Sequence, residues 1–238
     1  DVKIDAIDSD GGIGSMLLHV TVTDEDPDTN LSTPADEILA ETGTSGPDDV
    51  VLDSGAPNAS PTGGSVALGA GQDYVLIDTD ASFTAELSIS TGADDDKVVI
   101  AQTGANTIPP SIDLGGGDDI IELNSENSGV YTISLGTGSD TVRIGSDSIT
   151  AVPSISLFTN DDTLDLSALN LSTIDTTTSY SALIAAQSAV SAAAGPDIAY
   201  ATAGSDTYVV ISTDTDGTAD ITLQLLGVTN FDTDSIML

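Results

Sequence analysis

Six segments of the chain share one pattern of hydrophobic and polar positions. Each has two apolar residues at i and i+2, a turn that ends in Asp and is mostly glycine-rich, and a second apolar run. The segments cover residues 66–77, 89–100, 112–123, 133–144, 155–166 and 200–211, and a weaker copy covers residues 44–53. Alternation such as Ile112 and Leu114 turns one side chain in two toward an interior, so each unit predicts strand, tight turn and strand.

The spacing of the turn aspartates gives the period of this repeat. The last Asp of each turn falls at Asp49, Asp73, Asp96, Asp119, Asp140, Asp162 and Asp206. Neighbouring positions lie 21–24 residues apart, and the final interval of 44 is twice 22. A regular period of this length indicates stacked coils. The sequence therefore predicts an all-β fold, a parallel β-solenoid of about seven coils of about 22 residues.

The doubled interval contains a segment of different character. Residues 181–194 are rich in Ala, and Gly195 and Pro196 follow them. Ser179 or Ser181 can cap a helix here, and the Gly-Pro pair stops it. We therefore expect one short inserted helix near 181–194, which covers a side or edge of the solenoid and limits the addition of further strands.

The composition separates this chain from several classes of protein. It has 39 acidic and three basic residues in 238, a formal net charge of -36, which makes nucleic acid and anionic membranes poor partners. The absence of an apolar run of about 18 residues excludes membrane insertion. Although the charge and the low aromatic content of 3% favour disorder, 39% of the residues are hydrophobic and grouped in short runs. A narrow solenoid satisfies both observations.

Catalytic side chains are scarce. The chain has no cysteine, His19 is its single histidine, and no nucleophile motif surrounds a serine. Zinc and thiolate sites are therefore excluded as interpretations, and no enzyme activity is expected.

The aspartates themselves are the candidate chemistry. In stacked coils they would lie in one row, about 4.8 Å from one coil to the next, and would repel one another strongly. Cations between neighbouring turns remove that repulsion, and Ca²⁺ accepts carboxylate and carbonyl oxygens with flexible geometry. The pattern thus predicts calcium ions as partners and folding that depends on them.

Two of the turns, 115–119 (GGGDD) and 136–140 (GTGSD), resemble the RTX nonapeptide, which binds calcium in a parallel β-roll. The family carries this motif at both turns of a coil, whereas here one turn per coil has it, so we expect ions along one edge. Residues 158–160 replace the glycines and make a site there doubtful. The ligands implied by the resemblance are Asp73, Asp95, Asp96, Gly115, Gly117, Asp118, Asp119, Gly136, Gly138, Asp140, Asp161, Asp162 and Asp206.

Two further resemblances complete the domain organisation. Residues 160–169, 204–210, 225–228 and 231–238 resemble parts of the C-terminal target domain of type I secretion substrates. Residues 4–12 and 17–24 resemble the last hairpin of a cadherin-like or Ig-like repeat, and 24–28 resemble the acidic linker after it. The expected divisions are a hairpin at 1–28, a linker at 29–43, a calcium-binding solenoid at 44–166, and a C-terminal cap at 167–238 with the helix and the secretion-type region.

Three interpretations of the function remain open. The first is an extracellular, calcium-stabilised structural protein of a bacterial surface layer, sheath, filament or adhesin. It would assemble as a homo-oligomer, lattice or filament, and cell-surface polysaccharide is a possible partner. The second is a non-catalytic RTX module of a larger secreted enzyme. The third is an acidic protein of a halophile, which predicts aspartates spread over the surface instead of gathered at turns.

Overall fold

The computed structural model describes residues 29–33, 38–53, 63–78, 85–102, 106, 108–124, 130–145, 149, 151–169, 171, 179–180, 183–192, 197–214, 216 and 218–238. The hairpin predicted over residues 1–28 lies outside the described residues. The stretch 29–43, predicted as a linker, contains two strands, β1 (Thr29–Thr33) and β2 (Ile38–Thr42).

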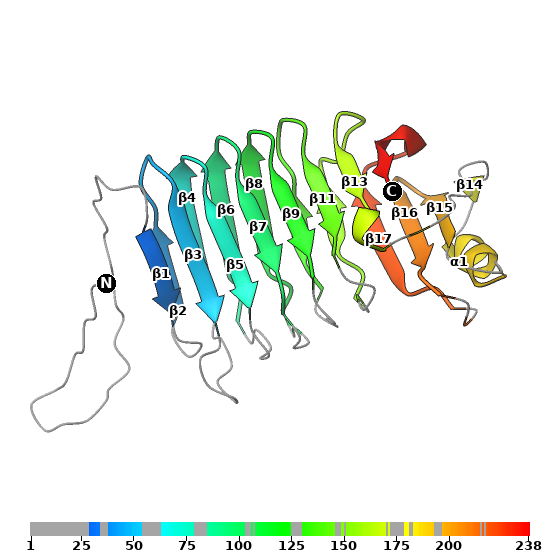
Figure 1. Cartoon of the computed structure of the whole chain (residues 1–238), viewed down its shortest axis with the longest axis horizontal. Helices are drawn as coiled ribbons and strands as arrows, with labels where there is room; N and C mark the ends of the chain where they lie inside the picture. The colour runs from blue at the N-terminus through cyan, green and yellow to red at the C-terminus, as the bar shows by residue number, and fades with distance from the viewer. Residues whose placement is uncertain are drawn as a thin grey trace, which may run out of the picture.

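Two β-sheets make up most of the described part of the chain (Figure 1). The eight-stranded sheet has, in spatial order, β1, β3 (Asp48–Asp53), β5 (Tyr74–Asp78), β7 (Lys97–Ile100), β9 (Ile120–Leu123), β11 (Thr141–Ile144), β13 (Thr163–Asp165) and β18 (Ile236–Met237). The ten-stranded sheet has β14 (Ser179–Tyr180), β15 (Asp197–Ala203), β16 (Asp206–Ser212), β17 (Ile221–Leu226), β12 (Ser154–Ser156), β10 (Thr132–Ser134), β8 (Ser111–Gly116), β6 (Leu87–Ala93), β4 (Gly63–Ala70) and β2.

From β2 to β13 the chain alternates between the two sheets, and neighbouring strands in each sheet are parallel. This is the parallel β-solenoid that the sequence predicts. Four coils, namely β4–β5, β6–β7, β8–β9 and β10–β11, have a coil on both sides, and β2–β3 and β12–β13 flank them. The tight turns lie along one long edge, at the top of Figure 1.

Inward side chains stack from coil to coil between the sheets. Ile112 on β8 is opposite Ile89 on one side and Ile133 on the other, and all three are buried. Ile121 on β9 has the corresponding position in the eight-stranded sheet. Because each coil buries its apolar residues only against its neighbours, the core is a thin layer of Ile, Leu and Val.

The predicted seventh coil does not form. Residues 200–211 belong to β15 and β16, which pair with each other in antiparallel fashion, and β16 pairs antiparallel with β17. Gly204, with a φ of 70°, begins a two-residue connection between Ala203 and Asp206, which closes a hairpin. The stack is therefore shorter than the seven coils expected, and β17 resumes parallel pairing with β12.

The predicted helix is present as α1 (Leu183–Ala192). It lies against β15 and β16 at the C-terminal end of the molecule (Figure 1), where Ala186 packs with Ala199, Ala201 and Val210. Two short 3₁₀ helices, η1 (Ser167–Leu169) and η2 (Thr233–Ser235), lie in the same C-terminal third. Among the described residues, no helix has the length and apolar character needed to cross a membrane.

Candidate cation-binding row of aspartates

The tight turns bring one aspartate of each coil into a single row. Each carboxylate after the first accepts, at its Oδ1 atom, a hydrogen bond of 2.8–2.9 Å from the main-chain N–H of the aspartate one coil earlier. All members are at most 2% exposed. We call this set the turn row: Asp48, Asp73, Asp96, Asp119, Asp140 and Asp162.

Glycines allow the turns to stack this closely. Gly92 has a φ of 114°, which side chains of L-residues rarely adopt, and a methyl group on it would overlap the carbonyl oxygen of Gly69 in the preceding coil. The same arrangement recurs where Gly115 packs on the carbonyl of Gly92. The glycine positions therefore let main-chain carbonyl oxygens approach the next turn.

Three carboxylates in the middle of the row are incompletely satisfied. The Oδ2 atoms of Asp73, Asp96 and Asp119 are buried and accept no hydrogen bond from any described residue. A buried polar atom without a partner destabilises a fold, and a buried charge does so more strongly. These three positions are where the row has capacity for a ligand.

Burial also changes the acidity of the row. It raises the pKa of Asp73 and Asp119 to about 7, and neighbouring carboxylates add to the effect while the main-chain N–H donor opposes it. Burial likewise raises the pKa of Asp140 to about 6 and shifts the pKa of Asp96 in the same direction. At neutral pH the row therefore favours uptake of either protons or cations.

The two terminal aspartates of the row differ from those in the middle, because a threonine donates hydrogen bonds to the Oδ2 atom of each carboxylate. Asp48 Oδ2 accepts the main-chain N–H of Thr44 at 2.7 Å, and the Thr44 hydroxyl lies within 3.4 Å of the same carboxylate. Asp162 Oδ2 accepts the N–H of Thr159 at 2.6 Å and its hydroxyl at 3.1 Å. The Oδ2 atom of each terminal carboxylate thus has protein donors, and the Thr159 cap lies in the segment 158–160 that the sequence marked as doubtful.

Sequence reasoning chose the wrong residue at the first turn. Asp48 occupies the row, whereas Asp49 is the cross-strand partner of Tyr74 and lies on the outer face of β3. The sequence does contain the information that separates the two residues. Each aspartate of the turn row precedes the first inward apolar residue of its strand by two positions, as Asp48 precedes Val50. Thr44 and Thr159 were also missed, because their capping role depends on the local turn.

Asp206 does not belong to the row. It begins β16 in the antiparallel hairpin, where its carboxylate accepts hydrogen bonds from Gly227 N–H at 3.0 Å and from the Gln224 side chain at 2.9 Å. These donors lower its pKa. Because β16 belongs to an antiparallel hairpin, no following coil in the described part of the chain places an equivalent turn aspartate next to Asp206.

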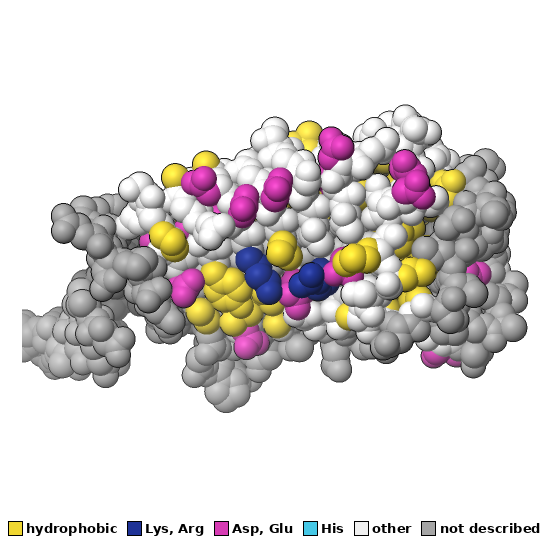
Figure 2. Space-filling model, turned by 45° about the horizontal axis from the view of Figure 1, so that its top comes forward, with side chains coloured by type: hydrophobic (Ala, Val, Ile, Leu, Met, Phe, Trp, Pro, Cys, Tyr) yellow, Lys and Arg dark blue, Asp and Glu magenta, His cyan; other side chains and the backbone are white. Residues whose placement is uncertain are grey.

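A second line of carboxylates lies outside the turn row. Asp95 accepts the N–H of Asp118 at 2.9 Å, Asp118 accepts the N–H of Ser139 at 2.8 Å, and both are exposed. Asp161 is also exposed, and its N–H donates to Thr159. Acidic side chains consequently recur along the turn edge in Figure 2.

The remaining predicted ligands are the turn glycines. The carbonyl oxygen of Gly115 accepts the N–H of Thr137 at 2.9 Å and faces Gly136, while the carbonyl of Gly117 faces Gly138. These oxygens thus lie between neighbouring turns. The structure brings the predicted carbonyls and carboxylates to one edge, and metal binding by them stays a prediction.

A separate acidic cluster lies between β16 and β17. The carboxylates of Asp214, Asp216 and Asp220 have oxygens within 4.8 Å of one another. Each already accepts turn hydrogen bonds, for example from Thr213 N–H to Asp220 at 2.6 Å. This cluster is exposed or half-exposed, and a solvated acidic turn accounts for it.

Comparison with known proteins adds no family assignment. No protein-family model matches the sequence, and a search of the curated proteins finds no match.

Proposed function

We propose that this chain is a calcium-stabilised structural solenoid of a bacterial cell exterior. The observation that carries the proposal is the set of three buried Oδ2 atoms, of Asp73, Asp96 and Asp119, that accept no hydrogen bond from the described residues. A fold that buries such atoms in a row is stabilised when a proton or a bound cation neutralises each carboxylate.

The donors in the row suit calcium better than other common metal ions. They are all oxygens, from carboxylates and turn carbonyls, and Ca²⁺ accepts six to eight of these in adaptable geometry. Asp73, Asp96 and Asp119 would hold the ions, with turn carbonyls such as Gly115 O completing the shell. Calcium modules of extracellular proteins bind with a Kd of about 10⁻⁴–10⁻³ M, which suits an exported protein.

The burial of the turn row argues against the interpretation that the aspartates serve only to keep the chain soluble. Carboxylates that only solvate a surface remain exposed, whereas those of the turn row are at most 2% exposed and are held by main-chain donors of the neighbouring coil. We propose a structural role and no catalysis, because these carboxylates are engaged in holding coils together.

The decisive experiment exchanges Asp119 for Asn and measures the free energy of unfolding in calcium and in EGTA. Asn keeps the Oδ1 acceptor for Asp96 N–H and removes the charge. With calcium at about 100 times Kd, loss of one ion should lower the stability by about 2–3 kcal/mol. In EGTA above pH 8 the same substitution should raise the stability, because it removes an unpaired buried charge.

The matched control is Asp113→Asn, the same chemical change at an exposed position on β8 of the same coil. It should leave the stability unchanged in both buffers. A wild-type chain whose circular dichroism and melting temperature ignore calcium and EGTA would exclude the proposal.

A further inference from the structure

A pocket of about 430 Å³ lies at the C-terminal end of the turn edge. It is formed by two segments that are far apart in the sequence, residues 157–160 after β12 and residues 226–230 at the end of β17. The two segments meet because β12 and β17 pair in parallel, with Ser156 opposite Leu226. The volume is in the range of small-molecule sites, which is about 300–1,000 Å³.

Leu157, in the wall of this pocket, departs from the repeat. In the two preceding coils the second residue of the apolar pair, Leu114 or Leu135, is fully buried. The equivalent Leu157 is 55% exposed and has a φ of 63°, a conformation that a bulky side chain rarely adopts. Phe158 is buried in its place. The fold thus keeps a strained, exposed leucine at the pocket, and strain of this kind is typical of functional positions.

Packing of the interior accounts for Phe158 and not for Leu157. The ring of Phe158 lies 6.1 Å from that of Phe231, which in turn lies 5.5 Å from Tyr200, so aromatic side chains fill the core at this end. A glycine at position 157 would allow the same arrangement without a strained backbone and without an exposed apolar side chain. The leucine therefore needs a reason outside the core.

The other side chains around the pocket are uncharged. Val228 adds to its apolar wall, and Asn160, Thr229 and Asn230 contribute amide and hydroxyl groups. These three side chains are exposed and make no hydrogen bond with any described residue. None of the described residues that line the pocket is charged, in a chain whose net charge is -36. The pocket therefore offers groups that both donate and accept hydrogen bonds beside an apolar surface.

We propose that this pocket binds a ring of an uncharged sugar. Sugar hydroxyls donate and accept hydrogen bonds, as the amides of Asn160 and Asn230 do, and the C–H groups of the ring pack against Leu157 and Val228. The net charge of the chain repels an anionic ligand, and the wall holds no carboxylate for a cation. The site adds attachment to neutral polysaccharide to the proposed structural role and does not depend on what occupies the turn row.

Amide NMR spectra in calcium buffer test the site, with circular dichroism to verify folding. Glucose, galactose, mannose and N-acetylglucosamine are the probes, each at about 20 mM, because a ligand of this size binds with a Kd of about 1 mM. At least one should shift the signals of residues 157–160 and 226–230 and leave those of β8 unchanged. Glucuronic acid, which adds a carboxylate to the ring, should bind at least about fivefold more weakly than glucose.

Two results of these titrations would overturn the proposal. One is the absence of shifts at the pocket with all four neutral sugars. The other is that the same signals shift without sugar as the chain concentration rises, which would identify a second copy of the chain as the occupant. A chain that folds without calcium and still binds a sugar would contradict only the role of calcium.

Substitutions in the wall separate recognition from folding. Asn160→Ala and Asn230→Ala should each weaken sugar binding about fivefold, whereas Gln72→Ala, which removes an exposed amide before β5, should not change it. Leu157→Gly relieves the positive φ and removes the apolar wall, so binding should weaken about fivefold while the melting temperature stays the same or rises. Unchanged binding in these three wall variants would refute the site, as would a lower melting temperature of Leu157→Gly with full binding.

Discussion

The main-chain N–H of Asp96 donates a hydrogen bond of 2.8 Å to Oδ1 of Asp119, the equivalent residue one coil later. One carboxylate oxygen thus fixes the neighbouring turn, while the other, Oδ2, is buried without a protein donor among the described residues. Asp73, Asp96 and Asp119 therefore couple the geometry of the stack to the charge state of the row.

Without calcium, stability should decrease as pH rises from about 4 to about 7. Asp73 and Asp119 titrate near 7 and Asp140 near 6 in the folded chain, against an ordinary pKa of 3.8. In that window the folded state holds protons that the unfolded chain has released, so raising the pH favours unfolding. Urea denaturation in EGTA at a series of pH values measures this slope.

The control for that slope separates the row from the overall charge of the chain. A double Asp73→Asn, Asp119→Asn variant should have a shallower slope between pH 4 and 7, because two of the shifted groups are gone. Asp113→Asn, at an exposed position, should keep the wild-type slope. Identical slopes in all three proteins would show that general charge repulsion governs the pH dependence.

The capped ends of the row should not contribute ions. Asp162 Oδ2 is satisfied by Thr159, whereas Asp119 Oδ2 has no donor among the described residues. Native mass spectrometry in calcium should therefore find fewer bound ions in Asp119→Asn than in the wild type and the same number in Asp162→Asn. Loss of an ion from Asp162→Asn and none from Asp119→Asn would reverse this assignment.

The stacked part of the fold was predictable because each repeat meets the same requirements for packing its coil against the next. Most coils have an inward apolar pair, a turn that tolerates close stacking, and a second inward pair, so the period is visible in the sequence. The segment 112–123 shows this directly, since Ile112, Leu114 and Ile121 are all buried as the alternation indicates.

The end of the stack was not predictable from the same pattern. Residues 206–211 read DTYVVI, which permits two choices of inward residues, Tyr208 and Val210 or Val209 and Ile211. The choice depends on whether β15 closes on β16 or pairs with a preceding coil, which is a matter of tertiary pairing. The Asp48–Asp49 doublet has the same ambiguity, because the apolar run 50–52 that follows permits either choice of inward residues.

Gly92→Ala should be among the most destabilising substitutions in the turns. It combines a φ of 114° with overlap between the new methyl group and Gly69 O, so we expect a loss of roughly 2–4 kcal/mol in the free energy of unfolding. Gly204→Ala shares the positive φ but has open space around the new atom, and about 1 kcal/mol is expected. Urea denaturation of both variants separates overlap from strain, and equal losses would refute the close stacking of turns.

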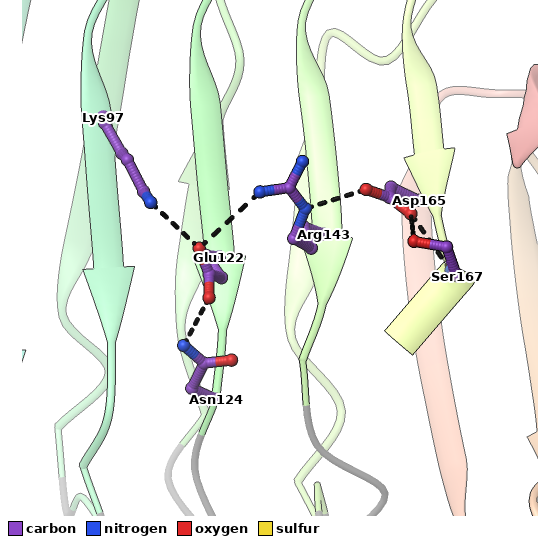
Figure 3. A network of polar contacts seen from close by, with 6 residues as sticks. All are labelled: Lys97, Glu122, Asn124, Arg143, Asp165 and Ser167. Carbon is purple, nitrogen blue, oxygen red and sulfur yellow. Dashed lines mark hydrogen bonds and ion pairs between the residues drawn. The ribbon is translucent and has the colours of Figure 1, made fainter. Parts of the chain in front are cut away.

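The polar network on the outer face of the eight-stranded sheet should contribute unequally to stability. Arg143 Nε donates at 2.7 Å to Asp165, which is 1% exposed, whereas the side chain of Lys97 is 39% exposed and pairs with the more accessible Glu122 (Figure 3). Arg143→Met should therefore lower the free energy of unfolding by about 1–3 kcal/mol, because it leaves a buried carboxylate with fewer donors. Lys97→Met should change it by less than about 0.5 kcal/mol.

Ionic strength distinguishes the two contributions. Salt screens the exposed Lys97–Glu122 pair and acts less on the Asp165 carboxylate. The effect of Arg143→Met should therefore persist in about 1 M NaCl, where the Debye length is about 3 Å. Comparable losses for both variants, or a loss for Arg143→Met that disappears in salt, would mean that Asp165 behaves as a solvated surface group. Ser167, whose N–H and hydroxyl donate to Asp165 at 3.0 and 2.6 Å, would then be its sufficient partner.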